Sequence, residues 1–129
     1  MEEYKGGFET LDVWKEARAY RISISTLVKS FPPIEKFRLV DQLIRSSRSV
    51  TANIAEGYGR YHYKENIQSC RMARGSLTET VDHLMCGYDE GYLEEVKLFE
   101  LKKQVDSISR KLNGYILYLK RRKDENDDE

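Results

Sequence analysis

The segment LFELKKQVDSISRKLNGYILYL, residues 98–119, shows the clearest helical pattern in this chain. An α-helix turns once in about 3.6 residues, so apolar residues in alternating steps of three and four line one face of it. The residues with this spacing are Leu98, Leu101, Val105, Ile108, Leu112, Tyr115 and Leu119. All charged residues of the stretch fall between them, as in a helix that packs one face against its neighbours. The stretch predicts a helix over 94–121.

Three further segments repeat this spacing, and only one position among them, Arg74, carries a charge. Their rows are Val13, Ala17, Tyr20, Ile24, Leu27 and Phe31; Val40, Leu43, Ser47, Val50 and Ile54; and Ile67, Cys70, Arg74, Leu77, Val81, Leu84 and Tyr88. They predict helices over 11–31, 35–56 and 63–90. Because the connections are short, successive helices should run in opposite directions. The sequence therefore predicts an all-α fold, an antiparallel up-down-up-down four-helix bundle.

Proline and glycine mark the expected helix ends. Pro32 and Pro33 should end the first helix, because proline disfavours helical geometry in the residue before it. Gly57 lies where a left-handed residue would close the second helix, and Gly91 is the expected end of the third.

The 129 residues suffice for one domain, which we place at 1–123. Residues 124–129 read DENDDE and hold five of the 22 acids and none of the 22 bases, so the body carries a net charge of +5. We expect this acidic end to be solvated and disordered. The alternative is that it folds back on the basic run at 120–123 and competes with an anionic partner.

Two further features of the sequence predict the cellular compartment of the protein. No stretch is long and apolar enough to span a membrane, and residues 1–5 lack the basic and then apolar run of an export signal. We therefore expect a cytoplasmic protein with no membrane partner, in which both cysteines stay reduced.

Several large apolar residues lie outside the four rows: Trp14, Ile22, Phe37, Ile44, Phe99 and Ile116. Exposed apolar groups of this size usually mark contacts with another chain. We expect self-association into a homo-oligomer. The alternative is that these residues widen the core of a single chain.

The sequence gives no support for catalysis, a metal or a cofactor. A di-metal bundle needs two Glu-x-x-His pairs, and the nearest approach, Glu79 with His83, has the wrong spacing. Cys70 falls on an apolar row and reads as a core residue, and the serines lack a nucleophile elbow. We expect neither an enzyme nor a cofactor.

Small residues thin the second predicted helix and should let another backbone approach it. They are Ser46, Ser47, Ser49, Ala52 and Ala55. Gly75 would cost about 1 kcal/mol inside the third helix unless close packing compensates. We therefore expect Gly75 to face this small stripe.

Basic residues with neighbouring aromatic rings suggest a surface for RNA or DNA. Arg38, Arg45 and Arg48 share a flank of the second helix, Arg60 and Lys64 follow its end, and Tyr61 and Tyr63 are candidates for base stacking. The basic run adds Lys120, Arg121, Arg122 and Lys123. Pairing of these arginines with acids of a neighbouring helix is the alternative.

The chain also resembles a known family. Residues 42–50 (QLIRSSRSV) and 53–57 (NIAEG) strongly resemble the "four helix bundle protein" family, first noticed as products of intervening sequences in large-subunit ribosomal RNA genes. The likeness continues at LDVWK (11–15), ARGSL (73–77) and GYL (91–93) and covers about residues 8–121. Thr51 departs from the pattern, since many relatives carry proline there.

The resemblance implies a homo-oligomer, typically a pentameric ring, without known catalytic activity. Relatives include the accessory variability proteins of diversity-generating retroelements, which bind nucleic acid and a reverse transcriptase through basic surfaces. Within the motifs, Asn53, Glu56, Gly57, Arg74 and Gly75 read as structural residues, with Asn53 and Glu56 satisfying backbone or arginine donors across helices.

From residues and resemblance together we expect a non-enzymatic bundle of the intervening-sequence family that assembles, as a pentamer, and binds RNA or DNA through basic surfaces. The alternative is a protein-interaction scaffold with no nucleic-acid role.

Overall fold

A computed structural model describes residues 6–126 of the chain. It contains four α-helices: α1 (Asp12–Leu27), α2 (Leu39–Gly59), α3 (Tyr63–Asp89) and α4 (Glu95–Asn126). Three single turns of 3-10 helix accompany them, at Phe8–Thr10, Val28–Ser30 and Pro33–Glu35. Residues 6–126 contain no strand. The predicted all-α class with four helices is confirmed.

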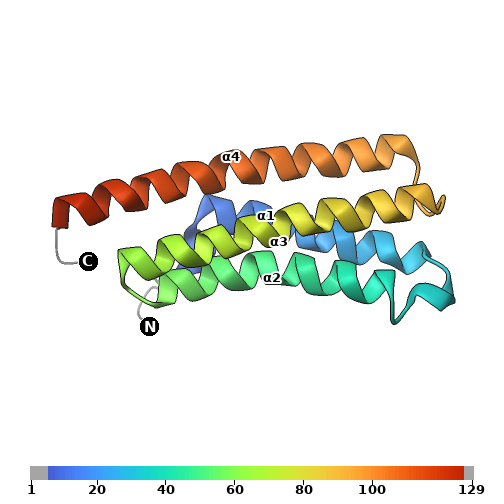
Figure 1. Cartoon of the computed structure of the whole chain (residues 1–129), viewed down its shortest axis with the longest axis horizontal. Coiled ribbons are helices and arrows are strands. Elements are labelled where there is room, and N and C mark those ends of the chain that lie inside the picture. Colours follow the sequence, from blue (N-terminus) through green and yellow to red (C-terminus); the bar gives the residue numbers. More distant parts are fainter. Residues whose placement is uncertain (1–5, 127–129) are drawn as a thin grey trace, which may run out of the picture.

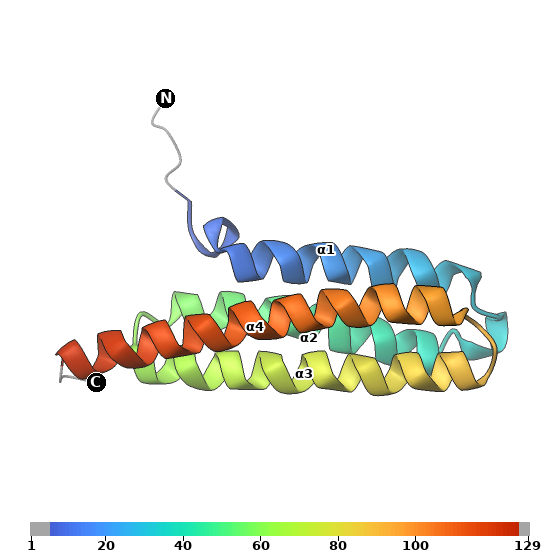
Figure 2. The same ribbon diagram turned by 90° about the horizontal axis from the view of Figure 1, so that it is seen from above.

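The four helices lie side by side in an elongated bundle (Figure 1). The α2–α3 loop lies at one end, and the α1–α2 and α3–α4 connections lie at the other. Each helix packs mainly on two others, since α1 packs on α2 and α4, and α3 packs on α2 and α4. The view from above places α1 and α3 on opposite sides of the bundle (Figure 2).

The core consists of the predicted apolar rows with a few shifts. Most row members are buried, including Tyr20, Leu43, Leu77 and Leu112. Tyr20 also forms a hydrogen bond with Thr80 across the centre of the core, with 2.6 Å between the two hydroxyl oxygens. Ile116, predicted to lie outside the row, is buried, whereas its neighbour Tyr115, a member of the row, is only half-buried.

A polar contact joins α1 to α4. Lys111 Nζ lies 2.6 Å from Glu16 Oε2, and the Ser107 hydroxyl donates to Glu16 Oε1 at 2.6 Å. Burial by itself would raise the pKa of Glu16, but the hydrogen bonds from Lys111 and Ser107 outweigh it, so this pKa lies below 4.5. The carboxylate therefore stabilises the folded chain in its charged form.

The first connection differs from the prediction at both of its ends. Helix α1 ends at Leu27, and Val28–Ser30 form a tighter 3-10 turn before the extended Phe31 that precedes Pro32. Helix α2 begins at Leu39 rather than residue 35, because Pro33–Glu35 form a separate turn. The two prolines thus disrupt more of the chain than their own positions.

The end of α2 corrects the prediction for Gly57. Gly57 is helical and buried, and α2 continues to Gly59. A Cβ atom at residue 57 would lie 2.7 Å from Asn66 Oδ1 and 2.8 Å from Ser69 Cβ, so this glycine allows α3 to approach. The left-handed residue after α2 is Tyr61, with a φ of 61°.

The prediction for Gly91 is confirmed. Its φ is +80°, its N–H donates to Tyr88 O, and the N–H of Tyr92 donates to Gly87 O. These two bonds form a Schellman motif, which closes α3.

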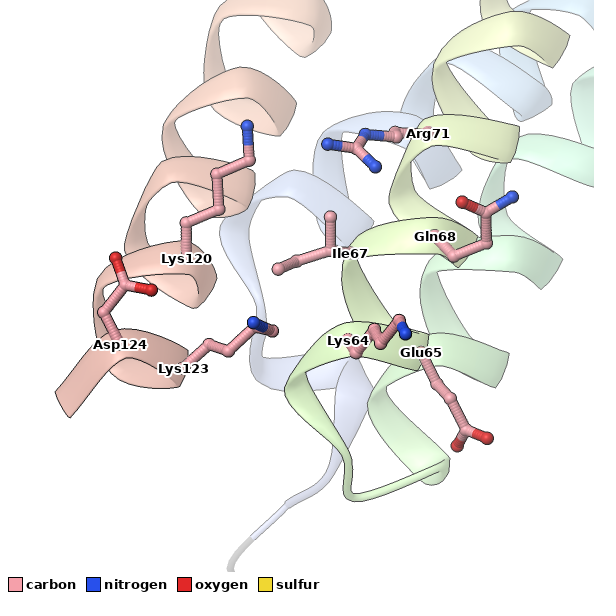
Figure 3. Close-up of a pocket in the computed structure, with 8 residues that line it drawn as sticks. All are labelled: Lys64, Glu65, Ile67, Gln68, Arg71, Lys120, Lys123 and Asp124. Carbon is pink, nitrogen blue, oxygen red and sulfur yellow. The ribbon is translucent and has the colours of Figure 1, made fainter. Parts of the chain in front are cut away.

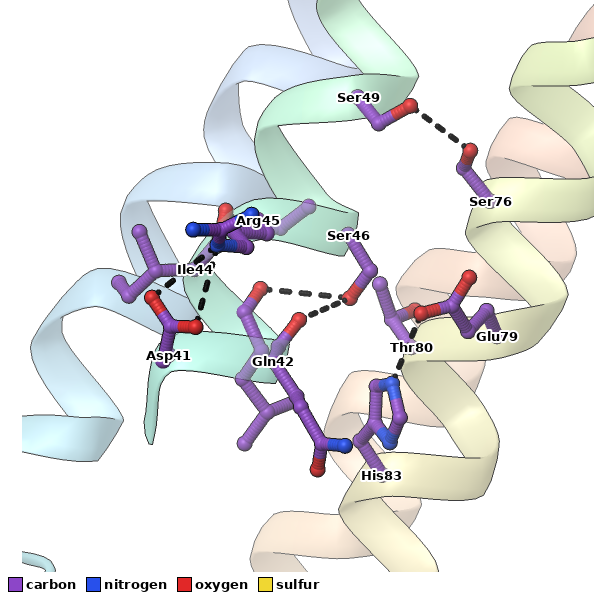
Figure 4. Close-up of polar contacts among 12 residues, drawn as sticks. Asp41, Gln42, Ile44, Arg45, Ser46, Ser49, Ser76, Glu79, Thr80 and His83 are labelled. Carbon is purple, nitrogen blue, oxygen red and sulfur yellow. Dashed lines mark hydrogen bonds and ion pairs between the residues drawn. The ribbon is translucent and has the colours of Figure 1, made fainter. Parts of the chain in front are cut away.

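The prediction that Gly75 faces the small residues of α2 is wrong, and Arg74 does not lie on the buried face with the other residues of its row. Both residues are exposed, and a Cβ atom at residue 75 would meet nothing within 4 Å. Arg74 donates to Asn113 of α4 at the surface, at 2.8 Å. The small residues of α2 meet α3 through other positions: Ser49 and Ser76 share a hydrogen bond of 2.9 Å (Figure 4). The spacing of apolar residues in steps of three and four does not determine which side of α3 faces α2.

The predicted disordered tail at 124–129 requires a correction in its first half. Helix α4 continues through Asn126, so residues 124–126 are helical. Hydrogen bonds and ion pairs of the last turn support it, since Arg122 Nη1 lies 3.3 Å from Glu125 Oε2 and Asn126 donates to Arg122 O. Residues 127–129 lie outside the described part of the chain.

Candidate nucleic-acid interface

A groove lies between the first half of α3 and the last turns of α4. It encloses about 680 Å³. Its lining residues are Lys64, Glu65, Ile67, Gln68, Arg71, Lys120, Lys123 and Asp124. Figure 3 shows the Lys64, Arg71, Lys120 and Lys123 side chains arranged around Ile67, with Glu65 and Asp124 at the outer edges. The interior of the groove is therefore positively charged.

Helical spacing explains how the groove forms. Lys64, Gln68 and Arg71 follow steps of four and three, so they share one face of α3. Lys120 and Lys123, three residues apart, share the facing side of α4. The bases of the two helices meet because α3 and α4 pack along their length. None of these four bases forms an ion pair within the described residues.

The groove brings together three predicted binding residues, Lys64, Lys120 and Lys123, from segments far apart in the sequence. Sequence reasoning missed Arg71. Its seven-residue separation from Lys64, two helical turns along α3, is the signal that points to it. The facing residues on α4 follow only from the register of the two helices.

The other predicted arginines lie elsewhere. Arg38 and Arg45 are near the start of α2, at the opposite end of that helix from Arg60 and Lys64. Arg45 pairs with Asp41 at 3.1 Å (Figure 4), and Arg60 pairs with Glu56 at 3.0 Å. The predicted set therefore does not form one continuous surface.

Arg48 lies in a shallower groove between α1 and α2. This groove of about 490 Å³ is also lined by Trp14, Arg21 and Thr51, and by the small residues Ala52 and Ala55. The Arg21 guanidinium donates to Thr51 Oγ1 at 2.9 Å. The hydroxyl of Thr51 thus holds an arginine in place.

The tyrosines of the α2–α3 loop differ from each other. Tyr61 is 85% exposed, whereas Tyr63 is half-buried. The pKa of Arg122 is raised because its guanidinium donates a hydrogen bond to the Tyr63 hydroxyl. Of the remaining basic run, Arg121 is exposed on α4. Tyr61 is thus the more accessible of the two predicted stacking residues.

The two polar residues of the 53–57 motif do not act across helices. Asn53 donates to the backbone oxygen and the hydroxyl of Ser49, and Glu56 accepts from Arg60. All of these partners belong to α2 or its C-cap. The contacts stabilise the end of α2, and removing either residue would leave the contacts of the other intact.

Features of metal and thiol chemistry are sparse in the described residues. Residues 6–126 contain no group of three or more His, Cys, Asp or Glu side chains that could hold a metal ion. His83 and Glu79 form a pair on α3, with 2.9 Å between nitrogen and oxygen (Figure 4). Burial raises the pKa of Cys70 to about 12, so its thiol stays protonated.

Within residues 6–126, no helix has the length and apolar character that a membrane span requires.

These features define a class: an all-helical bundle with an open basic groove on its surface. The chain belongs to the 23S rRNA-intervening sequence protein family, whose model matches residues 9–114.

Among solved structures, the chain is similar to the crystal structure of a protein with unknown function from the S23 ribosomal protein family of Bacteroides thetaiotaomicron VPI-5482. The TM-score is 0.74 at 22% sequence identity, over 81% of this chain and 97% of that one. This likeness supports the fold. No curated protein matches the chain.

Proposed function

We propose that this chain is a non-enzymatic, up-down-up-down bundle that self-assembles and binds the backbone of a nucleic acid in the α3–α4 groove. The observation that carries the proposal is the arrangement of Lys64, Arg71, Lys120 and Lys123 around Ile67, with both acids at the edges. Lysine and arginine side chains provide most phosphate contacts in nucleic-acid complexes.

Charge and shape both favour a phosphate backbone over a small metabolite. The groove is open to solvent along the bundle axis and offers two bases from each helix. Bases that lack an acidic partner within the described residues can pair with phosphates without first breaking an ion pair. Binding of this kind releases counterions and weakens steeply as salt rises.

Fluorescence anisotropy with a labelled RNA or DNA oligonucleotide tests the proposal. Four phosphate contacts predict a log–log salt slope of about −2.8 for a single strand, or roughly 50-fold weaker binding at about 200 mM than at about 50 mM salt. The double variant Lys64→Gln/Lys120→Gln should reduce the slope by about 1.4. The matched control, Lys29→Gln/Lys102→Gln, removes two exposed lysines outside the groove and should leave the slope unchanged. Absence of binding at low salt overturns the proposal.

Self-assembly is supported by apolar side chains that a single chain leaves in solvent. Phe37, Ile34, Val96 and Phe99 are all more than half exposed. Surfaces of this kind usually contact another chain. We propose a ring of copies, five as the family resemblance implies. Native mass spectrometry should give a pentamer, and a monomer at micromolar concentration would contradict assembly.

A protein-interaction scaffold is the second candidate, favoured by the pairing of Arg45 with Asp41 and of Arg60 with Glu56. Under that function the arginines serve structure or subunit contact. The double reversal Arg45→Glu/Arg48→Glu separates the two functions. Loss of the assembly would assign these arginines to subunit contacts, whereas an intact assembly with unchanged oligonucleotide binding would agree with a ligand site in the α3–α4 groove.

A further inference from the structure

A tyrosine-rich pocket lies at the same end of the bundle as the basic groove. It encloses about 340 Å³, between the start of α1, the α2–α3 loop and α4. Its aromatic and polar lining includes Tyr58, Tyr61, Tyr63, Asn66, Tyr115 and Tyr118. This volume is at the lower end of the range for small-ligand sites. The pocket suits one flat ring system.

The pocket and the groove lie on two sides of the same helix contact. On α3, Asn66 lines the pocket and the next residue, Ile67, lines the groove. On α4, Leu119 lines the pocket and Lys120 lines the groove. Successive residues of a helix point about 100° apart, so one polymer crossing this end of the bundle can contact both.

We propose that the protein binds single-stranded nucleic acid, with phosphates in the α3–α4 groove and one unstacked base in the tyrosine pocket. This inference rests on the proposed function and adds the class of nucleic acid to it. Bases of a duplex are stacked and paired inside the helix, so only a single strand can place a base against protein rings.

The rings of the pocket are arranged for stacking. Tyr115 and Tyr118 lie nearly parallel, with an interplanar angle of 12° and 6.3 Å between ring centroids. Tyr118 remains 53% exposed, so this pair is accessible to a ligand. A base can extend the pair as a third ring.

A fixed hydroxyl adds a polar group for the edge of the base. The Asn66 amide donates to the Tyr115 hydroxyl at 3.2 Å, which leaves the proton of that hydroxyl for another acceptor. Burial raises the pKa of Tyr115, so the hydroxyl remains a donor. Oxygen and ring-nitrogen acceptors on bases suit this donor.

Tyr61 is the most exposed ring of the pocket, and its backbone is left-handed, with a φ of 61°. Glycine and asparagine adopt this conformation more readily than tyrosine. The ring is 85% exposed, so burial in the core does not explain its presence. A ligand that stacks on the ring explains why an exposed tyrosine stands at this position.

The test compares roughly 12-nucleotide single strands of RNA and of DNA with a duplex of the same sequence, by anisotropy at one salt concentration. Single strands should bind more tightly than the duplex. Tyr118→Leu and Tyr61→Asn should each weaken single-strand binding roughly 5- to 150-fold with an unchanged salt slope, since stacking releases no counterions. Tyr88→Leu is the matched control, because Tyr88 is a partly exposed tyrosine near the end of α3 that lines neither the pocket nor the groove, and this variant should leave binding unchanged.

The outcomes separate this inference from the proposed function. Equal binding of duplex and single strand, with no effect of either tyrosine variant, overturns the base pocket while the groove variants still change the salt slope. Absence of binding to every oligonucleotide overturns both. Thermal melts of the tyrosine variants exclude unfolding as the cause, and Tyr61→Asn is expected to fold normally because asparagine tolerates the left-handed backbone.

Discussion

Tyr20 and Thr80 allow a sharp test of how the opposite helices α1 and α3 are joined in the core. Both side chains are fully buried. The Thr80 hydroxyl donates to the backbone oxygen of Leu77 at 2.6 Å, which uses its single proton. The Tyr20 hydroxyl must therefore be the donor in the 2.6 Å bond to Thr80 Oγ1. Burial raises the pKa of Tyr20 to about 12, so this donor is present at neutral pH.

This direction predicts an asymmetry between the two single variants. Tyr20→Phe removes the donor and leaves Thr80 still bonded to Leu77, so the free energy of unfolding should fall by about 1 kcal/mol. Thr80→Val has nearly the same shape but leaves a buried phenol donor without an acceptor, and should cost about 2 kcal/mol. In the Thr80→Val background, Tyr20→Phe removes the stranded donor and should recover about 1 kcal/mol.

Urea unfolding followed by circular dichroism at 222 nm measures the cycle. Protein concentration is held constant, because assembly contributes to apparent stability. Equal m-values across the four proteins would show that the comparison reports stability alone. If Tyr20→Phe costs the same free energy in both backgrounds, the assigned direction of the hydrogen bond is wrong.

Three other predictions concern glycines, thiols and acid. Gly57→Ala should lower the free energy of unfolding by about 1–3 kcal/mol, because the new methyl group would clash with α3. Gly75→Ala should raise it by up to about 1 kcal/mol, because residue 75 faces open space and alanine favours a helix. Urea unfolding measures both variants, and changes of the same sign would contradict the packing. A thiol reagent at mildly alkaline pH should modify exposed Cys86 at once and buried Cys70 only after unfolding, and two fast thiols would refute this. Because the folded pKa of Glu16 lies below 4.5, its charged form stabilises the fold above that pH, and the effect is lost as pH falls through the folded pKa. On acidification, the free energy of unfolding should therefore fall less steeply for Glu16→Gln than for the unaltered protein. Identical curves would contradict the charged contact.

The helices and most of the core follow from the sequence because periodicity is a local property. Apolar steps of three and four assign a residue such as Leu112 to the buried face whatever the helix packs against. Gly91 closes α3 as predicted, since the left-handed turn involves only the residues next to it. The predicted helix ends near Pro32 and Pro33 are less accurate, because 3-10 turns replace α-helix there.

The basic groove follows from the sequence only in part. The run at 120–123 and Lys64 are visible as charges, but their meeting requires the register of α3 against α4. In the sequence, Arg45 and Arg60 look as available for phosphate binding as the residues of the groove. Each forms an ion pair with an acid four residues earlier, Asp41 or Glu56.

What the sequence determined by itself is the helical class, the faces that are buried and the excess of positive charge before residue 124. The packing of the four helices settles which small residues meet and which charges converge: Gly57 rather than Gly75 faces another helix, and Arg71 joins the lysines of α4. The physical reason is that spacing along a helix sets the relative angle between its own side chains. The rotation and register of one helix against another depend on the shape of all four packed faces together.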